Sequence, residues 1–238
     1  MRRVPWLPTT LILLILVLGG VYAVALRQGL VPSQYNPLAP IDLKDPSGWF
    51  RDWRIQHLAR NPGLCAQSLS GPLVDAKPVK DKDGPNGCGW HNSVSLSSAG
   101  GAKLSPFVIS CPVAAALSMW MAHEVQPLAE RLLGSRVVQL EHAGGYSCRN
   151  MVSHRTFMTA FKSQHANANA VDIMAFQLAD GRRIAVKGGW KGPDAQGLFL
   201  KAVHASACGY FRVVLGPDFN ALHHDHFHLD RGTWLRCK

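Results

Sequence analysis

The chain has 238 residues, of which 47% are hydrophobic and 17% charged. This composition is typical of a packed globular protein and excludes a largely disordered one. The net charge of +10 at pH 7 would suit an anionic partner such as nucleic acid, anionic lipid or a wall polymer. Because the basic residues are scattered and form no nucleic-acid-binding motif, we expect no nucleic-acid partner.

The N-terminal segment predicts a membrane helix. An uncharged run extends from Leu7 to Leu26 and is long enough to cross a bilayer. Arg2 and Arg3 precede this run, which indicates a cytoplasmic N-terminus and places the rest of the chain in the periplasm, anchored to the inner membrane by a single pass. A cleaved signal peptide is the alternative, because Ala23-Val24-Ala25 resembles a cleavage site, but the apolar run is longer than a usual signal core.

We divide the chain into three parts. Residues 1–30 form a cytoplasmic tip and transmembrane anchor, residues 31–47 an extended proline-rich spacer, and residues 48–238 one exported domain. Within that domain, aromatic and aliphatic spacing predicts a helix from Trp49 to Ala59, ending near Asn61-Pro62-Gly63. Residues 76–104 are rich in Gly, Asp, Lys and Ser, and we expect loops and short strands there.

The clearest helix signal runs from Pro112 to Leu133, with Gly134 as its stop and Pro127 as a kink or a break into two helices. Another helix is expected from Asp194 to Ala207. Alternating and β-branched patterns predict the strands Arg136–Glu141, Ala170–Leu178, Arg182–Lys187, Phe211–Leu215 and His226–Asp230. We therefore expect an α+β fold, in which a small antiparallel sheet with flanking helices carries a zinc site.

The cysteines agree with export. All six follow the membrane segment, and an oxidising compartment favours two or three disulfides. Six cysteines allow fifteen pairings, and the sequence leaves the choice open. They are Cys65, Cys88, Cys111, Cys148, Cys208 and Cys237.

Metal-ligand candidates lie in two segments near the C-terminus. His165 precedes Asp172 by seven residues, and His226-Phe-His228 comes later. Asp172 lies within an apolar run, where a buried carboxylate is costly unless it is paired or coordinated. On a strand, His226 and His228 would face the same side. Two imidazoles and a carboxylate suit Zn²⁺ with an open fourth position, as in a hydrolytic site, and spacing alone does not choose between these two histidines.

These motifs resemble those of the bacterial extensin-like C-terminal domain family over roughly residues 45–238. More broadly, they are similar to the superfamily that joins lysostaphin-type peptidases, D-alanyl-D-alanine metallopeptidases and the hedgehog signalling domain. The Ser/Pro repeats of plant extensins are absent from this sequence. The matching segments are Tyr146–Asn150, His165–Ile173, Leu215–Asn220 and His224–Asp230.

The resemblance implies a zinc centre formed by His165, Asp172 and His228. It also implies that His226 is a catalytic imidazole beside the metal rather than a ligand. Arg149 resembles the arginine of the Gly-Tyr-Arg motif of the D,D-peptidases, which contacts the substrate or the developing oxyanion. The match is looser here, because two residues separate the tyrosine from the arginine.

Several neighbouring residues have secondary expected roles. Asp225 has the spacing of the Glu in the Glu-x-x-His motif of D,D-carboxypeptidases, but we prefer His226 as the base. Ser163 or Gln164 could orient a ligand. A disulfide at Cys148 could fix the loop that presents Arg149. We expect His223 and His224 to be exposed in a polar loop and His204 to lie in the core or behind the ligands.

Three functions are compatible with this pattern. The first is a membrane-anchored zinc peptidase, of the D,D-carboxypeptidase or endopeptidase type, acting on peptidoglycan stem peptides or cross-links. The alternative is a non-enzymatic zinc-containing module that binds the cell wall or a partner. An iron oxygenase with two histidines and one carboxylate is disfavoured, because such enzymes usually place His and Asp two residues apart.

Overall fold

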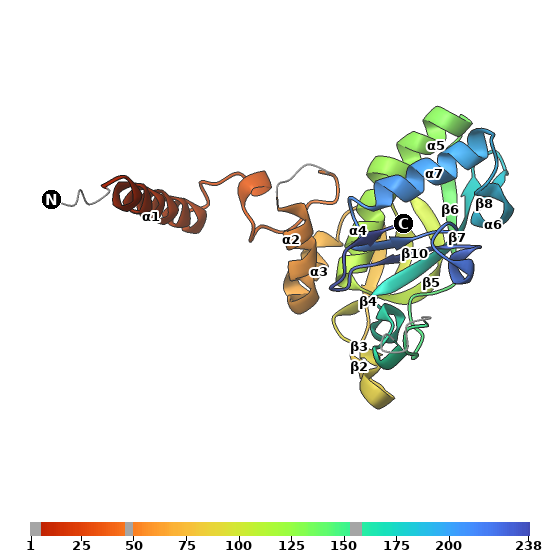
Figure 1. The fold of residues 1–238 in the computed structure, drawn as a ribbon, viewed down its shortest axis with the longest axis horizontal. Coiled ribbons are helices and arrows are strands. Elements are labelled where there is room, and N and C mark those ends of the chain that lie inside the picture. Colours follow the sequence, from red (N-terminus) through yellow and green to blue (C-terminus); the bar gives the residue numbers. More distant parts are fainter. Residues whose placement is uncertain (1–5, 46–49, 153–158) are drawn as a thin grey trace.

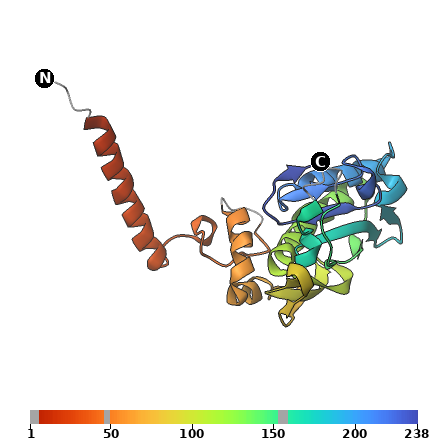
Figure 2. The same cartoon turned by 60° about the horizontal axis from the view of Figure 1, so that its bottom comes forward.

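The structure, a computed structural model, describes residues 6–45, 50–152 and 159–238; Arg2, Arg3 and Trp49 lie outside them. Helix α1 (Trp6–Arg27) stands apart from the folded domain (Figures 1 and 2). Its segment Pro8–Arg27 is exposed, and it is long and apolar enough to cross a membrane. A signal sequence has the same properties, so the helix fits both a membrane anchor and a signal peptide.

The segment between α1 and the domain includes a 3₁₀ turn, η1 (Ser33–Tyr35), and then packs against the folded part of the chain. Ile41 and Leu43 are each only 4% exposed. The buried Arg54 donates to the carbonyl oxygens of Ala39 (3.1 Å) and Pro40. Residues 39–43, which we expected in an extended spacer, are therefore held against the domain.

Three short helical segments follow, α2 (Arg51–His57), η2 (Leu58–Arg60) and α3 (Pro62–Ser68). The expected helix over 49–59 corresponds to the first two. Pro62 begins a new helix instead of leading into a loop, because a proline is accommodated in the first helical turn, where its missing N–H has no intrahelical partner.

The domain centres on one nine-stranded sheet, in the order β1-β4-β5-β6-β7-β10-β9-β11, with β8 paired to β7. The pairings are antiparallel except β5 with β6 and β9 with β11. The strands are β1 (Val74–Pro78), β4 (Ser93–Ala99), β5 (Ala102–Ser110), β6 (Val137–His142), β7 (Ala170–Leu178), β8 (Arg183–Ala185), β9 (Val213–Leu215), β10 (Phe227–Asp230) and β11 (Arg236–Cys237). A separate two-stranded sheet joins β2 (Lys82–Asp83) to β3 (Gly89–Trp90).

The expectation of a small sheet was wrong, since the sheet has nine strands. The region 76–104, where we expected loops and short strands, contributes to β1, β4 and β5. β4 and β5 form a long hairpin that turns at Gly100 and Gly101, both with positive φ. A Cβ on Gly100 would lie 2.4 Å from the Cβ of Met121, so the turn packs against a helix in a way that only glycine allows. The serine-rich sequence of β4 concealed a partly buried strand.

The helix expected over 112–133 is present, with an interruption. It consists of α4 (Cys111–Trp120), a π-helical segment η4 (Met121–Val125) and α5 (Gln126–Leu133). Pro127 lies in the first turn of α5, so its missing N–H coincides with the local change in helical pitch. Further helices among the described residues include η3 (Pro85–Gly87), η6 (Gln164–Asn167), α6 (Val186–Gly189), α7 (Ala195–Ala207) and η7 (Ala221–His223).

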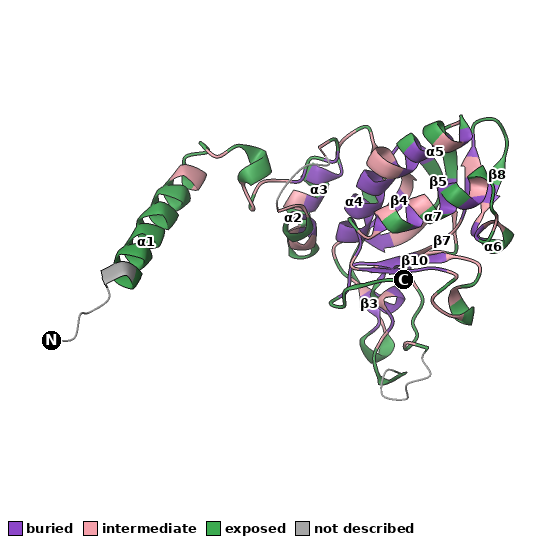
Figure 3. Cartoon of the chain, turned by 45° about the horizontal axis from the view of Figure 1, so that its top comes forward, coloured by how far each residue is buried: buried purple, intermediate pink, exposed green. Residues whose placement is uncertain are grey.

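The main core lies between the sheet and helices α4 and α7 (Figures 1 and 3). Trp120 of α4 packs edge-on against Phe176 of β7, with ring centroids 6.2 Å apart, and donates to the hydroxyl of Ser206 in α7 (3.0 Å). Phe176 in turn contacts Phe199 of α7, with centroids 5.3 Å apart. This packing fixes β7 against the helical layer.

Strands β7 and β10 present different residues to their two faces. Phe227 of β10 packs against His204 of α7, with ring centroids 5.0 Å apart, so Phe227 faces the helical layer. Phe227 is paired with Ile173, and the next pair in register is His228 with Asp172. Because side chains alternate along a strand, His228 and Asp172 point to the face away from α7.

Phe176 tests this packing. Replacing Phe176 with Ala should lower the free energy of unfolding by about 3–5 kcal/mol, because a fully buried aromatic ring is removed between β7 and α7. Urea unfolding of the full chain in detergent, followed by tryptophan fluorescence, measures the change. Phe161→Ala is the matched control, since Phe161 is 54% exposed, and its effect should be below about 0.5 kcal/mol. Equal effects of the two substitutions would contradict the assigned core.

Candidate metal centre

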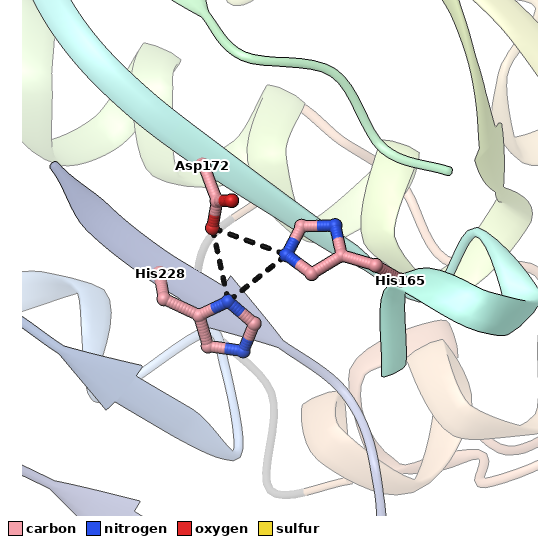
Figure 4. A group of neighbouring side chains, drawn as sticks. All are labelled: His165, Asp172 and His228. Carbon is pink, nitrogen blue, oxygen red and sulfur yellow. Dashed lines mark hydrogen bonds and ion pairs between the residues drawn. The ribbon is translucent and has the colours of Figure 1, made fainter. Parts of the chain in front are cut away.

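Three side chains from three elements converge on the face of the sheet away from α7 (Figure 4). His228 Nδ1 lies 3.0 Å from Asp172 Oδ1. His165 Nε2 lies 3.1 Å from Asp172 Oδ1 and 3.1 Å from His228 Nδ1. The side chains are largely buried, with exposed fractions of 4% for His165, 17% for Asp172 and 12% for His228. The structure thus brings together the three residues that the resemblance implies as ligands.

The turn η6 positions His165 over the sheet. Ser163 precedes the turn, and its hydroxyl accepts from the backbone N–H of His165 (3.4 Å). Ala168 ends the turn in the left-handed conformation, at a φ of 52°. The Gln164 side chain accepts from Asn169 (2.7 Å). Ser163 and Gln164 therefore shape the turn, and neither contact involves an imidazole nitrogen.

The outward nitrogens of both histidines have hydrogen-bond acceptors. His165 Nδ1 donates to the carbonyl oxygen of Gly145 (3.2 Å). His228 Nε2 donates to Asp230 Oδ2 (3.1 Å). When both rings are neutral, these contacts leave His165 Nε2 and His228 Nδ1 unprotonated. The lone pairs of these two nitrogens then point at the Asp172 carboxylate. Three electron-rich atoms at this separation repel one another unless a proton or a cation lies among them.

Gly145 and Asp230 are supporting residues to which the sequence reasoning gave no role. A Cβ on Gly145 would lie 2.6 Å from the Val108 carbonyl oxygen, so only glycine lets this loop approach β5 and offer its carbonyl to His165. Asp230 is two residues after His228 on the same strand and therefore on the same face. That alternation was a signal that could have identified it.

The electrostatics of the cluster favour a positive charge among its three side chains. Burial raises the pKa of Asp172, but hydrogen bonds from His165 and His228 and their positive charge outweigh it and hold that pKa well below its usual value. Burial likewise disfavours charged His228, yet hydrogen bonds to Asp172 and Asp230 raise its pKa to about 9. Without a metal, the site retains a proton near neutral pH.

The donor set fits Zn²⁺. Nitrogen and oxygen ligands bound tetrahedrally to one Zn²⁺ at roughly 2.0–2.1 Å lie about 3.3 Å apart, close to the separations in the cluster. The outward hydrogen bonds to Gly145 and Asp230 are the second layer of contacts that metal-binding histidines usually have. We identify this cluster as a candidate zinc centre formed by His165, Asp172 and His228.

His226 lies next to the cluster without belonging to it. Its Nδ1 donates to Asp225 Oδ1 (2.9 Å), which leaves Nε2 as the free acceptor, 3.7 Å from Asp172 Oδ1. The side chain is 17% exposed. Asp225, whose spacing suggested a possible base, is hydrogen-bonded to His226, and this contact lowers the pKa of its carboxyl. The geometry therefore makes Asp225 a residue that orients His226.

His223 is a site residue that the sequence reasoning missed. We expected it to be exposed, but it is half-buried, and its ring centroid lies 5.2 Å from that of His226 and 5.9 Å from that of His228. Its Nδ1 donates to Asn220 Oδ1 (2.7 Å). Burial and the charges of His228 and His226 lower its pKa to about 4. In the sequence, only the three-residue spacing between His223 and His226 could have indicated that His223 belongs to the site.

His224 and His204, the remaining histidines for which we stated an expected position, lie where we expected them. His224 is exposed, with 59% of its side chain accessible. His204 is buried in α7, packed between Trp190 and Phe227 and 7% exposed. Burial lowers the pKa of His204, as befits a neutral ring in the core.

Arg149 lies in an exposed loop whose backbone is tied to the site. Its carbonyl oxygen accepts a hydrogen bond (3.1 Å) from the backbone N–H of Ser163. Ser163 lies two residues before His165. Its positive charge acts on His223 and lowers the pKa of that ring, so the guanidinium lies within electrostatic reach of the site. The preceding Cys148 forms a disulfide with Cys88, which anchors this loop beside β3.

All six cysteines are paired, at the upper end of the two or three disulfides expected. Cys65–Cys111 joins α3 to α4, and Cys208–Cys237 joins the end of α7 to β11. The bridges cross-link the edges of the domain and the loop before Arg149. This pattern is consistent with folding in an oxidising compartment.

The sequence profile described as "Extensin-like protein C-terminus" matches residues 63–238. The chain belongs to the extensin-like protein C-terminus family. The match contains the whole cluster, His226, Arg149 and all three disulfides, and it begins at α3. Neither the curated proteins nor the solved structures contain a match to the chain.

The site predicts opposite pH dependences for metal affinity and metal-free stability. His228 has a folded-state pKa of about 9 against an ordinary 6.5, and Zn²⁺ must displace its proton. Apparent zinc affinity should therefore rise about tenfold per pH unit from about pH 6.5 to 9. The proton's stabilisation of the metal-free fold is fully present below pH 6.5 and is lost as the pH rises through 9. Chelator competition and urea unfolding measure these quantities; a flat affinity over this range would contradict the assignment.

Asp230 should support the metal through His228. Asp230→Asn keeps the shape of the side chain but replaces the charged acceptor of His228 Nε2–H with a neutral amide. Zinc affinity should fall about 10- to 100-fold. Asp218→Asn, at an exposed position, is the control and should leave the affinity unchanged. An Asp230→Asn variant with unaltered zinc affinity would show that this hydrogen bond does not tune the site.

Proposed function

We propose that the chain is a zinc-dependent peptidase that hydrolyses an amide bond in peptidoglycan peptides. The observation that supports this most is His226. Its Nε2 is an uncoordinated acceptor beside the three candidate ligands, and Asp225 fixes its tautomer. A purely structural zinc site is normally closed by a fourth protein ligand, whereas the cluster among the described residues has three.

The residues suggest a division of chemical roles. When bound, zinc would supply a Lewis acid that lowers the pKa of a coordinated water towards about 7 and polarises the substrate carbonyl. His226 accepts the proton of the attacking water at Nε2 and returns it to the leaving amine. The hydroxyl adds to the acyl carbon and the C–N bond breaks, so atoms and protons balance. Asp225 stabilises the imidazolium form of His226 between the two transfers.

Arg149 completes the proposed site. Its positive charge would attract the substrate's carboxylate or stabilise the developing oxyanion. The Cys88–Cys148 disulfide and the hydrogen bond from the Ser163 N–H to the Arg149 carbonyl oxygen hold this loop near the candidate metal site. Electrostatic preorganisation of this kind contributes most when the donor is held in place before the substrate arrives.

The substrate proposal rests on location and on resemblance. A domain tethered to the periplasmic face of the inner membrane by α1 would face the cell wall, and its net positive charge favours an anionic polymer. The motifs resemble those of the superfamily of lysostaphin-type and D-alanyl-D-alanine metallopeptidases, which suggests a stem peptide or a cross-link. The same superfamily contains the hedgehog domain, so the competing proposal is a zinc module that binds without cleaving.

Replacing His226 with Ala separates these proposals. We expect zinc-loaded full-length protein in detergent to cleave purified peptidoglycan or defined muropeptides, with products identified by mass spectrometry. His226→Ala should slow cleavage about 10²- to 10⁴-fold while zinc content stays near one per chain. His224→Ala, two residues earlier and exposed, is the control and should retain full activity. Wild-type protein that binds zinc but cleaves nothing would favour the binding module.

A further inference from the structure

Two tryptophans that lie far apart in the sequence are exposed on the folded domain. Trp53 of α2 and Trp234, in the loop between β10 and β11, are each 58% exposed. Leu235, beside Trp234, is 80% exposed. The other tryptophans whose burial the structure describes are buried or half-buried. Single exposed apolar side chains are common on protein surfaces, whereas a group of them marks a contact with a partner or a membrane.

Asp52 ties α2 to the β10–β11 loop. Its carboxylate accepts from Arg231 (2.5 Å), at the start of the loop, and from Arg212 (3.0 Å). Arg212 also donates to the carbonyl oxygen of Gly232 in the same loop (3.5 Å). Figures 1 and 2 both show this loop, in dark blue, beside α2. The two exposed tryptophans therefore lie on the same side of the domain.

That side of the domain is also bonded to α1. Arg54 of α2 donates to the carbonyl oxygen of Ser33 in η1 (3.4 Å). The carbonyl oxygen of Tyr35, the last residue of η1, accepts from the hydroxyl of Tyr22 in α1 (2.6 Å). Hydrogen bonds thus connect α1 through η1 to α2, the helix that carries one of the exposed tryptophans.

These contacts bring α2 close to a bilayer that α1 crosses. Tyr22 lies five residues before Arg27, the last residue of α1. This separation is about 8 Å along the helix axis. With Arg27 at the outer surface of the bilayer, Tyr22 lies in the interfacial zone, where Trp and Tyr side chains gather in membrane proteins. Leu30 and Leu38 of the connecting segment are 69% and 59% exposed. η1, and α2 beside it, therefore lie near the lipid headgroups.

We propose that Trp53, Trp234 and Leu235 insert into the outer interface of the bilayer that α1 crosses and hold the domain on it in one orientation. An indole combines an apolar body with one N–H donor, so it is favoured between acyl chains and headgroups. A second copy or another protein could cover these side chains, but neither explains why this side of the domain is the one bonded to α1. The proposal uses α1 as a membrane helix and does not depend on catalysis.

This orientation also sets the height of the candidate metal centre above the membrane. His228 precedes Arg231 by three residues, and β10 runs through Asp230 towards the loop. At the rise of an extended strand, the imidazole's backbone lies on the order of 10 Å from the start of the loop. One step here rests on the proposed function: a peptidase held in this way would act on peptides close to the membrane surface.

Quenching by brominated lipids tests the membrane contact. The full chain is placed in nanodiscs with and without brominated acyl chains. Subtracting the spectrum of Trp53→Phe or Trp234→Phe from that of wild type isolates the emission of each indole. We expect brominated lipid to lower both emissions at least about twofold, since interfacial tryptophans lie beside the acyl chains. The control is Leu198→Trp, because Leu198 is 55% exposed near the start of α7, on the side of the domain far from α1 (Figure 1), and its added indole should not be quenched.

A charge in the surface should release it from the membrane. In the Trp53→Glu background, the quenching of Trp234 should fall at least about twofold, because a carboxylate resists transfer into the interface and less apolar area is buried. Leu198→Glu is the matched control and should leave the quenching of Trp234 unchanged. An unchanged quenching of Trp234 in Trp53→Glu would show that the two indoles do not share one membrane-bound surface, and would overturn the proposal.

Three further results would overturn the proposal. The chain does not co-elute with the nanodiscs, which removes α1 as the anchor; it co-elutes but either indole is unquenched; or both indoles become shielded only when two chains share a nanodisc, which assigns the surface to a second copy. Quenching in His226→Ala should equal that in wild type, so the result stays separate from the fate of the peptidase proposal.

Discussion

The pairing of His228 with Asp172 across β10 and β7 is the contact on which the candidate site depends. Their register puts an imidazole and a carboxylate directly opposite each other on the face away from α7. The flanking pair, Phe227 with Ile173, is fully buried and contributes to the core. A one-residue slip of either strand would exchange these faces, so the packing of the core also fixes the positions of the metal-site residues.

Charge balance explains why the surroundings of the cluster are so fully hydrogen-bonded. His165, Asp172 and His228 direct electron-rich atoms at a common point, and the repulsion among these atoms is relieved only by a proton or a cation. Gly145 and Asp230 hold the two rings in the tautomers that create this arrangement. We therefore expect the site to bind a cation, because a bound cation would relieve the repulsion that the fold imposes on these ligands.

Local patterns predicted the elements around the ligands. Strand β7 covers the predicted residues, and helix α7 begins one residue after the start of its predicted range. The expected export predicted that the cysteines would pair, and all of them do. Which cysteines pair follows only from long-range packing, as between α3 and α4. The β4 strand was missed because its alternate positions are serines, whose role is set by the neighbouring strands.

Within the site, too, local sequence patterns were less informative than contacts between residues far apart in the chain. The family resemblance, rather than spacing, separated His228 from His226, and the geometry agrees in placing only His228 in the triangle with His165 and Asp172. His223 was missed because its burial arises from ring contacts with His226 and His228. A polar loop in the sequence becomes part of the site only after β10 has paired with β7.

The central claim is that these three side chains bind one zinc ion. X-ray absorption at the zinc edge, recorded on zinc-loaded full-length protein, tests it most directly. Our account predicts one zinc per chain with nitrogen and oxygen neighbours only, the multiple-scattering signature of two imidazoles, and loss of stoichiometric zinc in Asp172→Ala while the disulfides remain intact. Absence of bound zinc, sulfur in its coordination shell, or an unchanged spectrum in Asp172→Ala would contradict it.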